Sequence, residues 1–235
     1  MYIFDNIQAA IDNIDPSESP FIIKRFVNRE LCDDAVKEIG GYLNVFERNE
    51  RFFGENWHYK VKKNDTEFNS FLFNSLGSLP QSILPNIYEK IFDAYQNLGE
   101  DIPNDFSSHL QQGIEGKTIN PLVFWYPHGL GKFDWHQHPP TWQKFQLLIN
   151  LTQPLTDYDG GSTHVELEKN NIEVFDHNFE KGDMFCFPYT KWHKVDPILK
   201  GSIGGASKRI SLLMPLHPRN AVEVKMKTND GIVYG

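Results

Sequence analysis

Two histidines separated by one residue are the first feature of this sequence whose type and spacing could do chemistry. His136 and His138 lie in the segment GKFDWHQHPP at 131–140. If this segment is extended, side chains two residues apart point to the same side, so both imidazoles share a face with Asp134. Two imidazoles on one face could form half of a metal site. The simpler interpretation is that these are half-buried histidines that only form hydrogen bonds.

A third histidine, His193, follows the apolar segment DMFCFP at 183–188. A histidine at the end of a neighbouring strand of a barrel could reach the same point as His136 and His138. Histidines that hold a first-row metal and leave coordination positions open are typical of oxygen chemistry.

Arg209 and Ser211 alternate with apolar residues in the segment RISLLMPL at 209–216. In a strand, these two polar residues share one face, and Ile210, Leu212 and Met214 share the other. An arginine that faces the inside of a strand-built pocket is costly unless it pairs with an anion. Its planar guanidinium binds a carboxylate through two hydrogen bonds, and Ser211 adds a hydroxyl. This face is therefore a candidate carboxylate site, unless the strand exposes it to solvent.

Strands must position these side chains, and the second half of the sequence has the pattern of strands joined by turns. From residue 119 onward, short apolar units are bounded by Gly, Pro, Asn and Asp. The predicted strands are 121–127, 144–151, 162–168, 183–188 and 209–216. Their spacing indicates a barrel or a jelly roll of two sheets.

The first half has helical periodicity. Asn28 can cap a helix that ends at the glycine pair 40–41, and a second helix is predicted from about Gln81 to Gly99. The segment KVKKNDTEFN at 60–69 reads as a polar surface loop. We expect the helices to pack on the outside of one sheet, because each element then buries an apolar face.

Composition excludes several classes of protein. The chain has 235 residues, of which 40% are apolar and 23% charged, so neither a membrane protein nor a disordered chain fits. The net charge is −8 and the basic residues form no long run, which makes nucleic acid and membranes poor partners. With two cysteines and no signal peptide pattern, we expect a cytoplasmic protein that acts on a small-molecule or amino-acid substrate.

Several motifs occur in an order that resembles the iron(II)- and 2-oxoglutarate-dependent dioxygenases, over about residues 119–217. The series is HQH at 136–138, LLINL at 147–151, DGG at 159–161, KGDMFCFP at 181–188, WHKV at 192–195, Gly205, and RIS at 209–211. The segment 21–39 also resembles the opening strand and helix of prolyl-hydroxylase-like members.

The resemblance implies a mainly β fold with N-terminal helices and a double-stranded β-helix core of the jelly-roll or cupin-like kind. A single domain would span 1–235, with a support region at 1–118, a catalytic core at 119–217 and a C-terminal extension at 218–235. The implied cofactor is Fe(II), with 2-oxoglutarate and dioxygen as cosubstrates. The keto acid end of 2-oxoglutarate would chelate iron, and its far carboxylate would meet Arg209 and Ser211.

The sequence departs from the family pattern at the third metal ligand. The family usually has H-x-D where this chain has His138 in the aspartate position. The third ligand could be His138 itself, giving three histidines with His136 and His193. The alternatives are Asp134, an open position, or a carboxylate that swings in from Asp159 or Glu166.

A second departure is the long spacing from His193 to Arg209. The extra residues lie in GSIGGAS at 201–207, which is a candidate lid or a plain flexible turn.

We therefore expect an oxygenase that hydroxylates a small molecule or an amino-acid side chain and releases succinate and CO2. Two alternatives remain: a three-histidine iron dioxygenase or cupin-like metal enzyme without 2-oxoglutarate, and a non-catalytic jelly-roll binding module. The sequence leaves the substrate and the oligomeric state open. The aromatic residues expected either to line the substrate pocket or to form barrel core are Trp125, Tyr126, Phe133, Trp135 and Trp142.

Overall fold

The computed structural model covers most of the candidate site. It describes residues 1–46, 56–63, 66–73, 82–102, 117–119, 121–129, 131–138, 143–175, 178–199, 208–218, 225–228 and 231–234. Trp142, Gly205 and the candidate lid at 201–207 lie outside these ranges.

The larger sheet contains eight strands within the described ranges. In order across the sheet they are β1 (Tyr2–Phe4), β2 (Phe21–Ile23), β12 (Met184–Pro188), β8 (Phe145–Asn150), β15 (Lys208–Leu213), β6 (Leu122–Pro127), β4 (Thr66–Phe73) and β3 (Asn56–Lys63). β1 and β2 are parallel, and the other neighbours are antiparallel.

The smaller sheet contains six strands in the same described part of the chain. They are β11 (Asn171–Val174), β10 (Thr163–Glu168), β13 (His193–Val195), β7 (Phe133–Gln137), β17 (Lys225–Thr228) and β18 (Gly231–Tyr234). Two short pairs complete the strands: β9 (Asp159–Gly160) with β14 (Ile198–Leu199), and β5 (Lys117–Ile119) with β16 (Leu216–Pro218).

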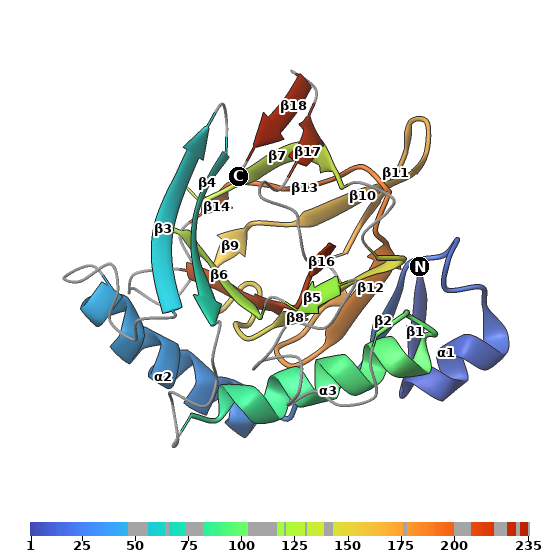
Figure 1. Cartoon of the computed structure of the whole chain (residues 1–235), viewed down its shortest axis with the longest axis horizontal. Coiled ribbons are helices and arrows are strands. Elements are labelled where there is room, and N and C mark those ends of the chain that lie inside the picture. Colours follow the sequence, from blue (N-terminus) through green and yellow to red (C-terminus); the bar gives the residue numbers. More distant parts are fainter. Residues whose placement is uncertain are drawn as a thin grey trace.

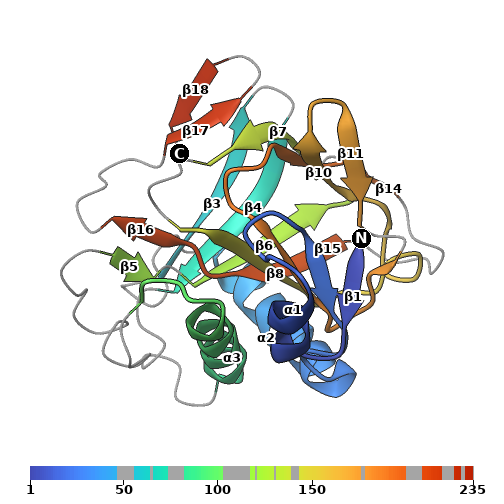
Figure 2. The ribbon, with the colours of Figure 1, turned by 90° about the vertical axis from the view of Figure 1, so that its right-hand side faces the viewer.

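The helices are α1 (Ile7–Asn13), α2 (Arg29–Phe46) and α3 (Leu84–Asn97). They gather on one side of the molecule, below the sheets in both views (Figures 1 and 2). Alternate residues of the larger sheet pack against them, for example Ile149 and Ile210. The residues between point the other way, and Leu148 and Leu213 pack with Val165 of the smaller sheet. The predicted mainly β fold with helices outside one sheet is confirmed.

Each of the five predicted strands coincides with a strand of the structure, namely β6, β8, β10, β12 and β15. The second predicted helix is also present. It carries Pro85 in its first turn and ends before Gly99, whose φ of 75° is the left-handed conformation that follows many helices.

Two predictions in the first half are wrong. The segment 60–69 is not a surface loop, because β3 and β4 pair over their full length as an antiparallel hairpin. Most of its polar residues belong to the two strands of this hairpin, of which β4 also pairs with β6. The glycine pair 40–41 does not end α2, which continues to Phe46. Glycine costs a helix only about 1 kcal/mol, and burial of Ala35 and Ile39 against the core offsets that cost.

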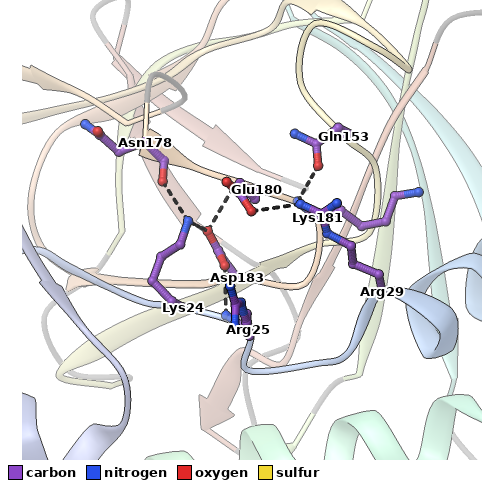
Figure 3. A network of polar contacts seen from close by, with 8 residues as sticks. All are labelled: Lys24, Arg25, Arg29, Gln153, Asn178, Glu180, Lys181 and Asp183. Carbon is purple, nitrogen blue, oxygen red and sulfur yellow. Dashed lines mark hydrogen bonds and ion pairs between the residues drawn. The ribbon is translucent and has the colours of Figure 1, made fainter.

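A buried carboxylate ties the N-terminal support to the turn before β12. Asp183 is fully buried and accepts hydrogen bonds from Lys24 Nζ at 2.5 Å, from the Arg25 backbone N–H at 2.9 Å and from the Glu180 backbone N–H at 2.8 Å. Figure 3 shows this network, which also contains the exposed Arg29–Glu180 ion pair. Buried and fully hydrogen-bonded, Asp183 fixes where β12 begins.

Gly182 gives a test of this junction. Its φ is 88°, and a Cβ at this position would collide with the backbone carbonyl of Val27. Gly182→Ala should therefore lower the free energy of unfolding by about 3 kcal/mol, from the left-handed backbone and from overpacking. Gly99→Ala is the matched control, because its φ is also positive but nothing lies within 4 Å of the added Cβ. Equal losses for both variants in urea unfolding would contradict the close approach to Val27.

Candidate metal centre

Three histidines converge at the middle of the smaller sheet. One nitrogen from each of His136, His138 and His193 lies within 4.8 Å of the others. Among the described residues this is the one group of three or more histidine, cysteine or acidic side chains with that spacing. His136 and His193 are buried, at 2% and 6% exposure, and lie opposite each other in the pairing of β7 with β13. Neutral imidazoles in this arrangement fit a first-row metal.

A β-bulge sets which residues of β7 share the inward face. The register between β13 and β7 shifts, with His193 opposite His136 but Val195 opposite Phe133. A spacing of two residues on β13 therefore corresponds to a spacing of three residues on β7. Both Phe133 and His136 are buried. Their rings stack at 3.8 Å. The strict alternation assumed from the sequence does not hold here, so Phe133 takes the inward position beside His136.

Backbone carbonyls orient two of the three rings. His136 Nδ1 donates to the carbonyl of Asp134 at 2.8 Å, and His193 Nδ1 donates to the carbonyl of Lys191 at 2.9 Å. With the proton on Nδ1, the lone pair of each imidazole is on Nε2. Histidines that bind metals are commonly held in this way, because the bond fixes both tautomer and ring direction.

Burial keeps these imidazoles neutral. It lowers the pKa of His193 to about 4, although the hydrogen bond to Lys191 opposes the shift. Burial, and next the neighbouring His193, lower the pKa of His136 well below its usual range. A neutral imidazole is the form that binds a metal, so the site is ready for metal at neutral pH.

The pKa of His193 predicts how the metal-free protein responds to acid. The unfolded chain takes up a proton at His193 near pH 6.5, whereas the folded protein resists it until about pH 4. Between these values the unfolded state binds more protons, so stability falls as the pH falls, by roughly 3 kcal/mol in total. His193→Asn should flatten the curve of unfolding free energy against pH in this window. An unchanged slope would contradict a buried neutral His193.

The carboxylates considered as third ligands lie outside the cluster. Asp134 contributes its backbone carbonyl to His136, and its Oδ1 accepts from the Trp135 backbone N–H at 2.8 Å. Asp159 is exposed, and Glu166 Oε1 accepts from the Asn170 backbone N–H at 3.0 Å. In this arrangement the third nitrogen of the cluster comes from His138.

Arg209 and Ser211 face the interior between the sheets. Arg209 is 1% exposed and Ser211 is fully buried, while Ile210 between them packs on the helix side. Arg209 donates through Nη1 to the carbonyl of Gly161 and through Nη2 to Thr163 Oγ1 at 2.7 Å. Ser211 Oγ is buried without a hydrogen-bond partner among the described residues. A hydroxyl left in this state fits a site that a polar ligand completes.

β10 connects the arginine to the histidines. Thr163, which accepts from Arg209, lies two residues before Val165, and Val165 is paired with His193. Two residues of a strand span about 7 Å. The side chain that binds Arg209 is therefore separated from the strand neighbour of His193 by about the length of a small molecule. Sequence reasoning missed Thr163. The alternation in STHVELE at 162–168 was the available signal, because it places Thr163 on the same face as Val165.

The aromatic residues expected to line a pocket divide among different surroundings. Tyr126 is buried beside Arg209, whose guanidinium lies 5.8 Å from its ring, and Phe133 stacks on His136. Trp125 packs with the helix-facing core. Trp135 lies on the other face of the smaller sheet, where Lys194 Nζ is 5.5 Å from its ring. Of these four residues, which are the described members of the set, Tyr126 and Phe133 belong to the interior site.

Comparison with known proteins identifies the fold. No family model matches this sequence, and no curated protein gives a significant match. A prolyl-4-hydroxylase from Pseudomonas putida aligns with a TM-score of 0.53 and 14% identity, over 90% of this chain and 98% of its own. A prolyl hydroxylase from Trichoplax adhaerens, solved with a hypoxia inducible factor peptide, aligns with a TM-score of 0.57 and 13% identity, over 89% and 90%. The chain has the fold of the iron(II)- and 2-oxoglutarate-dependent oxygenases.

This oxygenase fold, a double-stranded β-helix, does not decide the reaction. The alpha-ketoglutarate-dependent epimerase SnoN from nogalamycin biosynthesis aligns with the same TM-score as the Pseudomonas putida enzyme, 0.53, at 9% identity, over 89% of this chain and 83% of its own. Function must be argued from the site. Of the helices in the described ranges, none has the length and apolar character to cross a membrane.

Proposed function

We propose that this protein is an iron(II)- and 2-oxoglutarate-dependent oxygenase. It would hydroxylate a small molecule or an amino-acid side chain and release succinate and CO2. The observation that carries the proposal is the combination, in one interior, of three convergent histidine nitrogens with a buried arginine and a buried serine hydroxyl. The fold that this chain shares with prolyl hydroxylases supports this interpretation.

The residues divide into two groups by role. His136, His138 and His193 would hold iron through nitrogen. Arg209 and Ser211 would bind the far carboxylate of 2-oxoglutarate, because a guanidinium and a hydroxyl both donate to carboxylate oxygens. Bound iron with 2-oxoglutarate supplies the activation of dioxygen that side chains cannot perform.

The chain's own contribution is orientation. Carbonyls of Asp134 and Lys191 hold two histidine rings in place. Thr163 and Gly161 hold the guanidinium of Arg209 so that its direction is set before a ligand arrives. Such preorganisation lowers the entropy cost of binding.

Succinate formation tests the proposal. Protein supplied with Fe(II), dioxygen and 2-oxoglutarate should form succinate, with candidate amino acids and small metabolites added in turn. His193→Ala, assayed in parallel, gives the background. A wild-type rate equal to that background across all candidates would contradict the proposal.

The ligand set favours a second candidate, an iron enzyme without 2-oxoglutarate. Three histidines without a carboxylate form the cluster among the described residues, whereas the usual pattern of this oxygenase family has a carboxylate. In this second candidate Arg209 would not bind a cosubstrate carboxylate. Measuring 2-oxoglutarate binding separates the two.

Substitutions at His138 test the three-histidine centre. His138→Ala should weaken iron binding at least about tenfold, because a nitrogen donor is lost. His138→Asp restores a carboxylate donor and should still bind iron. Asp134→Asn is the control and should leave iron content unchanged, since the carboxylate of Asp134 lies outside the cluster. Elemental analysis measures the iron content of each variant. Loss of iron in Asp134→Asn but not in His138→Ala would mean that Asp134, and not His138, is the third ligand.

A further inference from the structure

Tyr189 lies directly against the third histidine. It follows Pro188, the last residue of β12, and is 1% exposed. Its ring is nearly parallel to that of His138, with an interplanar angle of 13° and centroids 4.3 Å apart. This is the geometry of a stacked pair.

Strand pairing fixes the backbone of two of the three histidines. His136 and His193 lie opposite each other in the pairing of β7 with β13. His138 lies one residue beyond Gln137, where β7 ends, and is only half-buried. Strand pairing therefore does not fix its backbone.

The segment that carries Tyr189 is itself well anchored. The Tyr189 backbone N–H donates to the carbonyl of Lys144 at 2.8 Å, just before β8. Glu100 holds that same point, because its Oε1 accepts from the backbone N–H groups of Lys144 and Phe145. On the other side, Gln137 Nε2 donates to the carbonyl of Thr190 at 2.5 Å. These hydrogen bonds fix the backbone around Tyr189, and so fix the position of its ring beside His138.

We propose that Tyr189 is a positioning residue that orients the imidazole of His138 toward the metal by ring stacking. The inference rests on the proposed function, since it requires His138 to be a ligand. A flat ring at 4.3 Å restricts rotation of the imidazole and so fixes the direction of its nitrogen lone pair. Hydrogen-bonding groups that orient metal ligands change metal affinity by about 10- to 100-fold, and we expect a stacked ring to act on the same scale.

Cobalt(II) binding to variants of the full chain tests the proposal. Tyr189→Leu and Tyr189→Met both remove the ring, and each should raise the Co²⁺ dissociation constant by about 10- to 100-fold. The visible absorption of bound Co²⁺ should change with the altered coordination. Tyr189→Phe keeps the ring and should rescue both properties to within about threefold of wild type. If one aliphatic variant fails to fold, the other gives the measurement.

Two controls separate positioning from general loosening of the core. Phe175→Leu removes an equally buried ring, whose centroid lies 3.7 Å from that of Phe185, and should leave Co²⁺ affinity within about threefold of wild type. In a His138→Ala background, Tyr189→Leu should have no further effect, because the ligand it orients is already absent.

The outcomes distinguish this inference from the proposed function. Wild-type affinity in both aliphatic variants overturns the role of Tyr189 while leaving the metal centre intact. A Tyr189→Phe variant as weak as Tyr189→Leu overturns stacking in favour of the hydroxyl. A Tyr189→Leu effect that persists without His138 overturns positioning. Failure of the wild-type chain to bind Co²⁺ removes the proposed function and this inference together.

Discussion

Replacing either His193 or His136 by alanine is expected to remove most of the bound iron and all oxygenase activity. Each of the two buried imidazoles provides one of three nitrogen donors, and each is already oriented by a backbone carbonyl. Loss of a donor should therefore cost more than the 10- to 100-fold typical of an orienting group, so iron occupancy should fall below about a tenth. The fold should persist, because the apolar core between α3 and the larger sheet is separate from the metal centre.

His164→Ala is the matched control for both variants. His164 lies on β10 in the same sheet, but its ring pairs with Asp196 at 2.6 Å on the other face, beside Trp135. Its loss should leave iron at the wild-type level. Elemental analysis of anaerobically loaded protein measures the occupancy. Wild-type iron in both His136→Ala and His193→Ala would count decisively against the assignment.

Arg209→Ala should weaken 2-oxoglutarate binding at least about thirtyfold, because a buried charge-assisted pair is worth roughly 2 to 5 kcal/mol. Ser211→Ala should cost about 1 kcal/mol, the contribution of one hydrogen bond. Arg209→Lys keeps the charge but loses the planar fork, so its affinity should fall between those of wild type and Arg209→Ala. Iron binding should be unchanged in all three variants, because none of these residues belongs to the histidine cluster.

The Arg209 series decides between the two candidate functions. Anaerobic calorimetry with iron-loaded protein measures the dissociation constant of 2-oxoglutarate directly. An unchanged constant in Arg209→Ala would favour the enzyme that needs no 2-oxoglutarate. Thermal unfolding of each variant accompanies the measurement, since Arg209 also donates to Gly161 and Thr163 across the sheets.

The alternation of polar and apolar residues along the segment 209–216 correctly predicted which side chains face the interior. Alternation predicts that Arg209 and Ser211 share one face, and the structure has both buried on the inward side. Ile210, Leu212 and Met214 pack on the helix side. This works because β15 is central in its sheet, with both faces buried and its register fixed by β6 and β8.

Features that depend on distant contacts were not predictable. The bulge in β7 arises from its pairing with β13, which is remote in sequence, and it exchanges Asp134 for Phe133 beside His136. The hairpin of β3 and β4 joins the larger sheet through the pairing of β4 with β6, which is remote in sequence. The stacking of Tyr189 on His138 joins the ends of two strands about fifty residues apart, and no local pattern encodes it.

Metal-dependent binding of 2-oxoglutarate is the most direct test of the central claim, because it needs no knowledge of the primary substrate. Titration of 2-oxoglutarate into anaerobic wild-type protein should show one site when Fe(II) is present and much weaker binding when it is absent. Both ends of the ligand would then be held, one at the histidine centre and one at Arg209. Absence of binding to the iron-loaded protein, or binding that is the same without iron, would contradict the account.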